Sequence, residues 1–325
     1  MTLNVGIVGC GLIGQKRAKA LAGAKLIATA DAVQERANAL AASVPGAQPY
    51  PDWQTLVRRP EVDIVVVCTT NDALAPVSLA AAEAGKHVLI EKPAARTSAE
   101  LLPLIEAVRR CNVRARVGFN HRYHPAFLKA RELLPTLGPL MFIRGRYGHG
   151  GRVGYDREWR ADPARSGGGE LLDQGVHLID LARLFLGDFP YVEGFAHTYF
   201  WDMPVDDNGF MMLRTEQNQV AWLHASCTEW KNLFSFEVYG RDAKLHIEGL
   251  GGSYGVERLA YYQMLPEMGP PDTTIWEYPR GDRSWELEFA EFLEDIRLER
   301  EPSASLNDAL AALQIVEKIY TLSTR

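Results

Sequence analysis

A glycine-rich turn between two short apolar runs, near the start of the chain, constrains the fold most strongly. Val5–Val8 predicts a buried strand, the turn follows at residues 9–14, and residues 26–30 predict a second strand. A helix is expected between them, from Gln15 to Ala22. Glycine at the first, third and sixth positions allows a tight turn, close approach of a pyrophosphate and close helix packing. This order predicts a dinucleotide-binding βαβ unit, with an ordinary glycine-rich α/β turn as the alternative.

The second strand ends at Asp31, whose carboxylate bears on the choice of dinucleotide. It can accept hydrogen bonds from both ribose hydroxyls of NAD, and it repels the 2′-phosphate of NADP. Arg36 opposes this preference because it can reach toward such a phosphate, so NAD is favoured and NADP is the alternative. The phosphates themselves are expected at the start of the helix, where the helix dipole favours an anion. The cofactor-binding residues expected from this unit are Gly9, Gly11, Leu12, Ile13, Gly14, Asp31 and Arg36.

Composition is that of an ordinary soluble globular protein and argues against several classes of partner. A length of 325 residues suggests about two domains, and a net charge of −6 argues against nucleic acid and anionic membranes. We expect neither a signal peptide nor a membrane span, since no basic leader or long apolar run is present. The four cysteines lack CxxC or metal-ligand spacing, which favours a reducing cytoplasm over a disulfide scaffold or zinc site. They are Cys10, Cys68, Cys111 and Cys227.

The apolar pattern divides the chain at about residue 122. Before it, short β-branched runs alternate with helical segments, which is typical of a doubly wound parallel sheet. Further strands are expected at 63–68, 87–90 and 116–119, and helices at 34–42, 75–84 and 99–110. We therefore expect an α/β fold in which residues 1–122 form a Rossmann domain.

Residues 123–325 are predicted to form a second α/β domain with a mostly antiparallel sheet. The apolar residues alternate there with the period of strands that have one covered face. Extended segments are expected at 140–147 and 191–249, with a hairpin at 234–247, and helices at 125–134, 170–185, 285–297 and 307–322.

Three polar motifs fall where this fold should bring them to the cofactor. Glu91-Lys92-Pro93 follows a strand directly, and doubly wound sheets bind ligands beyond the carboxyl ends of their strands. Lys92 can hold a substrate hydroxyl or stabilise a developing alkoxide, with a surface lysine as the alternative. The segment from Asn120 to Pro125 follows the last strand of the first domain. Its histidines at 121 and 124 have no third ligand in view, so no metal site is predicted.

The third motif joins a triple glycine, residues 167–169, to a helix that carries Asp173 and His177. The two residues are four apart, so they share one helix face. Neutral imidazole suits the removal of an alcohol proton, and a neighbouring carboxylate can orient it. A structural histidine capped by Asp173 or Asp180 is the alternative. The glycines favour the functional interpretation because they allow a ligand or another backbone to approach closely.

Together these motifs resemble the Gfo/Idh/MocA oxidoreductases over essentially the whole chain. The resemblance implies a Rossmann domain and a substrate-binding and oligomerisation domain, whose open sheet often buries its face in a homodimer or homotetramer. It implies NAD(P)-dependent oxidation or reduction of a secondary alcohol of a sugar, polyol or nucleotide sugar. By the same resemblance Lys92, Asp173 and His177 match the catalytic positions, with His177 the acid/base.

The loop after the fourth strand departs from the family pattern Thr-Pro-Asn-x-x-His. It has Thr70 in place of the proline and Leu74 in place of the histidine. Thr69, Thr70, Asn71, Glu91 and Lys92 are still expected to contact the cofactor.

The substrate is predicted less sharply than the reaction. Six arginines between residues 144 and 165 suit a phosphate or carboxylate, so an anionic or nucleotide-linked sugar is favoured, and pairing with nearby acids is the alternative. Tyr155 and Trp159 suit stacking on a sugar or base, or packing. The expected substrate-binding residues are Lys92, Asn120, Arg122, Tyr123, Trp159, Arg160, Asp173 and His177. Alternatives to a net dehydrogenase are a free sugar or inositol dehydrogenase, a glycoside-cleaving enzyme that oxidises transiently with NAD, and a non-catalytic sensor.

Overall fold

A computed structural model describes residues 2–267 and 269–324, and the chain divides into two compact units. Unit 1 comprises Met1–Phe119, Ala164–Gly167 and Trp285–Leu313. Unit 2 comprises Asn120–Pro163, Gly168–Ser284 and Gln314–Arg325. The boundary predicted at residue 122 is close to the start of unit 2, whereas the return of residues 285–313 to unit 1 was not predicted. Within the described residues no helix is long and apolar enough to cross a membrane.

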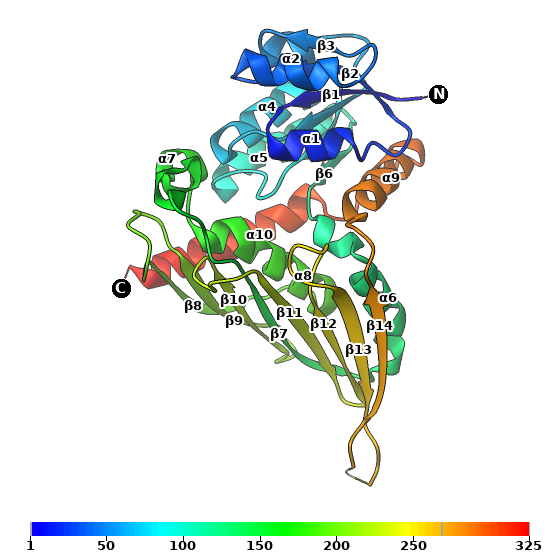
Figure 1. Cartoon of the computed structure of the whole chain (residues 1–325), viewed down its shortest axis with the longest axis vertical. Helices are drawn as coiled ribbons and strands as arrows, with labels where there is room; N and C mark the ends of the chain where they lie inside the picture. Colours follow the sequence, from blue (N-terminus) through cyan, green and yellow to red (C-terminus); the bar gives the residue numbers. More distant parts are fainter. Residues whose placement is uncertain (1, 268, 325) are drawn as a thin grey trace. The chain divides into compact units, whose positions relative to one another are not determined.

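Unit 1 is built on a six-stranded parallel sheet with the order β3-β2-β1-β4-β5-β6 (Figure 1). The strands are β1 (Asn4–Val8), β2 (Lys25–Ala30), β3 (Gln48–Tyr50), β4 (Ile64–Val67), β5 (His87–Ile90) and β6 (Ala115–Val117). The helices are α1 (Leu12–Ala18), α2 (Gln34–Ala42), α3 (Trp53–Val57), α4 (Asn71–Glu83), α5 (Ser98–Arg110) and α9 (Ser284–Arg297). The strand order reverses between β1 and β4, which is where doubly wound sheets bind their ligands. The predicted Rossmann sheet is confirmed.

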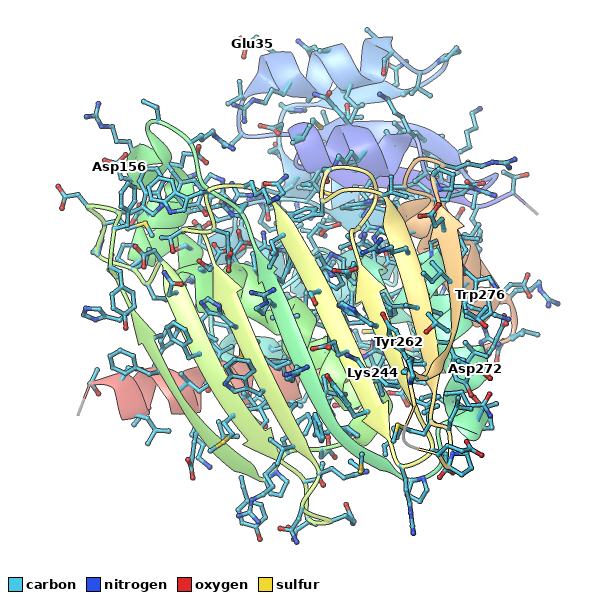
Figure 2. All side chains as sticks on the ribbon, turned by 60° about the horizontal axis from the view of Figure 1, so that its bottom comes forward. Glu35, Asp156, Lys244, Tyr262, Asp272 and Trp276 are labelled. Carbon is cyan, nitrogen blue, oxygen red and sulfur yellow. The ribbon has the colours of Figure 1, made fainter. Side chains whose placement is uncertain are left out.

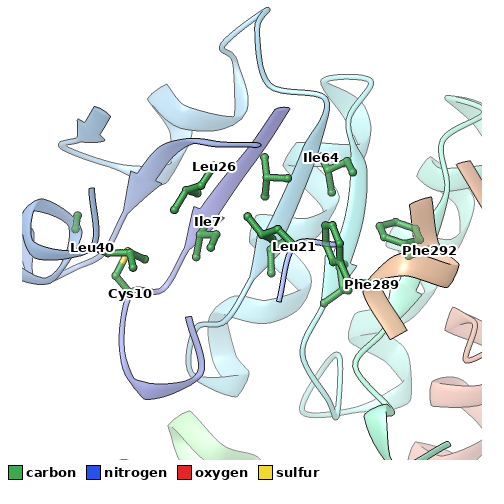
Figure 3. Close-up of a cluster of buried hydrophobic side chains, with 12 residues drawn as sticks. Ile7, Cys10, Leu21, Leu26, Leu40, Ile64, Phe289 and Phe292 are labelled. Carbon is green, nitrogen blue, oxygen red and sulfur yellow. The ribbon is translucent and has the colours of Figure 1, made fainter. Parts of the chain in front are cut away.

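The helix α9 belongs to unit 1 because its apolar face completes the core of that unit. Phe289 and Phe292, one helical turn apart, are fully buried and pack with Ile7, Leu21 and Leu89 (Figure 3). Burial of two phenylalanine side chains stabilises this attachment by several kcal/mol, at about 1.5–3 kcal/mol for each side chain.

Unit 2 is built on an eight-stranded sheet with the order β14-β13-β12-β11-β7-β10-β9-β8. All neighbours pair antiparallel except β7 and β10, which are parallel. The strands are β7 (Leu140–Gly148), β8 (Tyr191–His197), β9 (Asn208–Arg214), β10 (Val220–Ser226), β11 (Leu233–Gly240), β12 (Ala243–Glu248), β13 (Glu257–Gln263) and β14 (Asp272–Tyr278). The mostly antiparallel sheet predicted from the sequence is confirmed.

Helices cover one face of this sheet. The helix α8 (Val176–Leu186) packs on β7 and β10, and α6 (Pro125–Leu133) packs on β12, β13 and β14. The last helix, α10 (Leu306–Ser323), ends in unit 2. Burial alternates along β11 and β12, so every second side chain faces away from these helices. Figure 2 shows Lys244 and Tyr262 on neighbouring strands of the sheet, where they pair in register.

Candidate functional site

The glycine-rich turn of unit 1 adopts the geometry that a dinucleotide needs. Gly9 has a φ of +92°, and a Cβ there would lie 2.4 Å from the carbonyl oxygen of Cys68. A Cβ on Gly14 would lie 2.0 Å from the carbonyl oxygen of Gly9, so the helix can pack here only without a side chain. A Cβ on Gly11 would meet no heavy atom of the described residues within 4 Å outside its own turn, so this side of Gly11 is open to a ligand. The turn therefore fits a pyrophosphate held by backbone N–H groups.

Backbone hydrogen bonds fix the carboxylate of Asp31, whose contact with a ribose stays a prediction. Its Oδ2 accepts a hydrogen bond of 2.6 Å from Cys10 N, and its Oδ1 accepts one of 2.8 Å from Val33 N. These bonds hold the carboxylate beside the glycine turn, just after β2. Arg36 is exposed on α2, and α1 starts at Leu12, earlier than the predicted Gln15.

The residue before Lys92 has a structural role that the sequence did not predict. Glu91 accepts a hydrogen bond of 2.7 Å from Arg17 Nε, and Arg17 also pairs with Glu288 of α9. Arg17 and Glu288 are completely buried. Burial raises the pKa of Glu288, and the charge of Arg17 opposes that rise. Lys92 is half-buried and follows this ion cluster directly.

The loop after β4 is anchored within unit 1. Asn71 begins α4, and its side-chain amide donates a hydrogen bond of 2.8 Å to the carbonyl oxygen of Ser166. The Thr70 hydroxyl donates to Asp72 at 2.6 Å, and the Thr69 hydroxyl donates to the Thr70 carbonyl at 3.1 Å. The cofactor contacts expected of these residues stay predictions.

In unit 2 the segment after the triple glycine is a π-helical turn, η5 (Leu171–Gly175), followed by α8. The sequence predicted one continuous α-helix here, and π-turns are frequently found at functional sites. Asp173 lies in the π-turn and His177 in the first turn of α8. The two side chains are therefore not related by ordinary α-helical geometry.

Asp206 holds the start of this turn, and sequence reasoning missed it. Its carboxylate accepts hydrogen bonds from Gly169 N at 2.9 Å, Leu171 N at 2.7 Å and the Tyr320 hydroxyl at 2.7 Å. A Cβ on Gly169 would lie 1.9 Å from the Asp206 carbonyl oxygen. Because Gly169 has no side chain, the backbone of Asp206 can pack against it. Burial raises the pKa of Asp206, and these hydrogen bonds oppose the rise.

Asp173 is paired with Arg160. Arg160 Nε lies 3.1 Å from Asp173 Oδ2, and Arg160 Nη1 lies 3.6 Å from Glu158. The guanidinium also lies over the ring of Trp159, 4.7 Å from its centre. The carboxylate of Asp173 raises the pKa of Arg160. Two further arginines of the predicted anion-binding cluster are also paired, Arg144 with Glu237 and Arg152 with Glu158.

His177 is buried among aromatic rings of unit 2. Its imidazole stacks on that of His121 with ring centres 3.9 Å apart, and Tyr147 meets it edge-on at 6.0 Å. Asp180, which the alternative interpretation makes a cap for His177, forms a buried ion pair with Arg122 at 2.5 Å.

Three further residues predicted to contact the substrate lie in the buried 3₁₀ turn η1 (Asn120–Tyr123). The side-chain amide of Asn120 donates a hydrogen bond of 2.8 Å to the Ser284 hydroxyl, and Tyr123 is buried. Substrate contact by Asn120, Arg122 and Tyr123 stays a prediction. Nowhere in residues 2–267 or 269–324 do three His, Cys, Asp or Glu side chains converge as metal ligands. His124, the second histidine of the motif, lies 2.8 Å from Glu257.

Comparison with known proteins identifies the family. Residues 3–119 match the oxidoreductase family with an NAD-binding Rossmann fold, and residues 127–246 match the Gfo/Idh/MocA C-terminal domain. Inositol 2-dehydrogenase 2 of Saccharopolyspora erythraea is 34% identical over 78% of this chain and 73% of that protein. The chain belongs to the Gfo/Idh/MocA oxidoreductase family. The predictions of family, fold class and NAD as cofactor are thereby confirmed.

Other members of the Gfo/Idh/MocA family are also similar. Levoglucosan dehydrogenase of Pseudarthrobacter phenanthrenivorans is 30% identical over 66% of this chain, and the match spans 58% of that enzyme's length. A solved structure of a levoglucosan dehydrogenase in complex with NADH superposes with a TM-score of 0.90. It is 25% identical over 100% of this chain and 97% of that one. The chain is an oxidoreductase of the family that includes these sugar and inositol dehydrogenases.

Proposed function

We propose that this protein transfers hydride between NAD and a secondary alcohol of an uncharged sugar or polyol, with His177 as the acid/base. The observation that carries this proposal is the buried imidazole of His177 in the first turn of α8, which follows the π-turn whose Asp173 carboxylate is paired with Arg160. The two segments supply a base of the right kind and a carboxylate of defined orientation.

Each residue has a distinct task in this mechanism. NAD supplies the hydride acceptor when it is bound. The neutral imidazole of His177 takes the alcohol proton during oxidation and returns it during reduction. Asp173 stabilises the resulting imidazolium. Lys92 stabilises the negative charge that develops on the substrate oxygen.

The pairing of the arginines favours an uncharged substrate. Arg160, Arg144 and Arg152 each already face a carboxylate, so binding an anion there would require breaking an ion pair. The sugar and inositol dehydrogenases to which this chain is similar support the same class. The anionic or nucleotide-linked sugar predicted from the sequence is the alternative that the experiment tests.

The test is NADH formation with a panel of myo-inositol, scyllo-inositol, levoglucosan, glucose and UDP-glucuronate. We expect turnover with at least one uncharged member. His177→Asn should lower kcat by at least about 100-fold, as for loss of a general base, and leave NADH affinity within about threefold. His197→Asn, an exposed histidine of unit 2, is the matched control. Equal losses of turnover and of NADH affinity in His177→Asn would contradict the assignment.

The panel also separates the alternatives. Turnover of UDP-glucuronate with a KM that rises in Arg160→Ala would favour the anionic substrate, whereas an unchanged KM would remove Arg160 from its recognition. Release of an aglycone without net NADH, tested with aryl glycosides, would favour glycoside cleavage. Faster turnover with NADP than with NAD would overturn the role proposed for Asp31.

The homodimer or homotetramer and the cytoplasmic location predicted from the sequence stay proposals. Native mass spectrometry gives the oligomeric state directly, and a monomeric mass would refute the first of them.

A further inference from the structure

The imidazole of His177 lies face to face with a second imidazole of unit 2, that of His121. The ring centres are 3.9 Å apart and the planes are inclined by 15°. The two residues are 4% and 5% exposed, so neither ring is freely hydrated. His121 comes from η1 and His177 from α8, and the stack therefore joins segments that are distant in sequence.

One buried ion pair joins the two segments independently of the stack. Arg122, the neighbour of His121, donates a hydrogen bond of 2.8 Å to Asp180 on α8. This places a buried, two-point clamp between η1 and α8 one turn away from His177. A ring carried by so rigid a segment can define the plane of its neighbour.

Phenols and charged groups surround the imidazole pair. Tyr147 of β7 meets both rings edge-on, with centres 5.1 Å from His121 and 6.0 Å from His177. Burial raises the pKa of Tyr147 far above its usual range, so this phenol stays neutral during any assay. Tyr254 packs on it at 5.2 Å. His124 meets the His121 ring edge-on at 5.7 Å and pairs with Glu257, and the Arg122–Asp180 ion pair links η1 to α8. The charges of Asp173 and Glu170 act on Tyr147.

Stacking has two physical consequences for an acid/base imidazole. First, it restricts the ring to one plane, and misplacement of a reacting group by about 1 Å can cost about 100-fold in rate. Second, it couples the charges of the two rings. Two protonated imidazoles about 4 Å apart repel each other by several times the thermal energy even at an effective dielectric constant of 20. Protonation of one ring therefore opposes protonation of the other.

We propose that His121 is a positioning residue for His177, whose plane it fixes and whose charge is coupled to its own. The inference rests on the acid/base role proposed above for His177. When His121 is neutral, the ring of His177 accepts the substrate proton without a facing positive charge, and a protonated His121 makes His177 a weaker base. Two coupled ionisations therefore shape the acid limb of the pH–rate profile.

Two substitutions separate the positioning of the ring from the coupling of the ring charges. His121→Asn removes the ring, and we expect kcat for NAD-dependent oxidation of myo-inositol to fall by about 10- to 100-fold with KM changed less than about threefold. His121→Phe keeps a flat ring that does not titrate. It should recover most of kcat, while the acid limb becomes a single ionisation and moves up by about half a pH unit or more.

Imidazole NMR titration of the NADH-loaded protein gives the same information without turnover. His121 and His177 should titrate together in two coupled steps in the wild type, and His177 in one step in His121→Phe. The matched control is His197→Asn, because the exposed ring of His197 also stacks, on Phe195 with centres 5.7 Å apart. It should leave kcat, the pH profile and NADH affinity unchanged.

The outcomes distinguish this inference from the proposed function. Wild-type kcat and pH profile in His121→Asn, together with an inactive His177→Asn, would overturn the inference alone. An active His177→Asn would overturn the proposed function. If His121→Asn does not fold, the acid limb and the titration of His121→Phe decide, and an unchanged limb with independent single-step titrations refutes the coupling of the two ring charges.

Discussion

Replacing Arg17 with methionine should destabilise unit 1 more than any comparable surface change. The Arg17 side chain is completely buried, 2.6 Å from Glu91 and paired also with the buried Glu288. Removing one partner of a buried ion pair costs about 3–5 kcal/mol because the remaining charge is left uncompensated. Arg17→Met leaves two such carboxylates, so we expect at least about 3 kcal/mol. At about 2–4 °C per kcal/mol this lowers Tm by about 6 °C or more.

The loss of stability in Arg17→Met should become larger as the pH rises. Burial raises the pKa of Glu288 above its ordinary 4.5 even with Arg17 present, and loss of the guanidinium raises it further. A carboxyl whose folded-state pKa exceeds its unfolded value binds more protons when folded. The stability of Arg17→Met therefore falls as the pH rises above about 4.5. Urea unfolding followed by circular dichroism at pH 5 and pH 8 should show the larger loss at pH 8.

The matched control is Arg297→Met on α9, the helix that carries Glu288. Arg297 pairs with Glu294 at 2.6 Å, but both side chains are more than half exposed. Such a pair contributes about 1 kcal/mol or less. The reasoning would be refuted if Arg17→Met lost no more free energy of unfolding than Arg297→Met, or if its loss did not depend on pH.

Two further predictions concern the nucleotide turn and the open sheet face. Gly14→Ala places a Cβ against the Gly9 carbonyl, so NADH affinity measured by fluorescence should fall by at least about tenfold; an unchanged affinity would show that the turn gives way. Burial raises the pKa of Glu237, but hydrogen bonds from Lys244 and Arg144 outweigh it and hold that pKa at about 2. This stabilisation is complete above the unfolded value of 4.5 and is lost as the pH falls toward 2. The lower urea midpoint of Glu237→Gln at pH 7 should therefore converge with the wild type near pH 2, and a constant difference would exclude the mechanism.

Local chemistry made the first half of the fold predictable. The roles of Gly9 and Gly14 follow from contacts within a few residues or with the adjacent strand, and the apolar runs of β1 and β4 mark a sheet covered on both faces. The amphipathic pattern likewise predicted α9, with bounds that differ from the observed ones by one residue at its start. It could not predict which unit α9 joins, because apolar side chains such as Phe289 and Phe292 can be buried equally well in the core of either unit.

The sequence could not reveal which distant residues pair with each other in the folded chain. Arg122 lies in a motif that suggested substrate binding, yet its charge is matched by Asp180. Asp206 occurs in a loop without any motif, and its role depends on a backbone approach at Gly169. The π-turn spans only Leu171–Gly175, which is too short for the spacing of its apolar residues to distinguish it from an α-helix. The sequence thus located the candidate site but left open the pairs that shape it.

The buried ion cluster also links the stability of unit 1 to the proposed chemistry. Glu91 pairs with Arg17, and Lys92 is the next residue in the chain. The ion cluster therefore restrains the backbone that carries the side chain of Lys92. Arg17→Met should then lower kcat by about tenfold or more at a temperature where the variant is fully folded, since a displaced Lys92 stabilises the alkoxide less. Lys92→Met measured alone sets the upper limit of that loss, because the two substitutions act through one group. Arg17→Met added to Lys92→Met should therefore lower kcat little further, whereas a full additional loss would show that Arg17 acts on turnover by a route that does not involve Lys92.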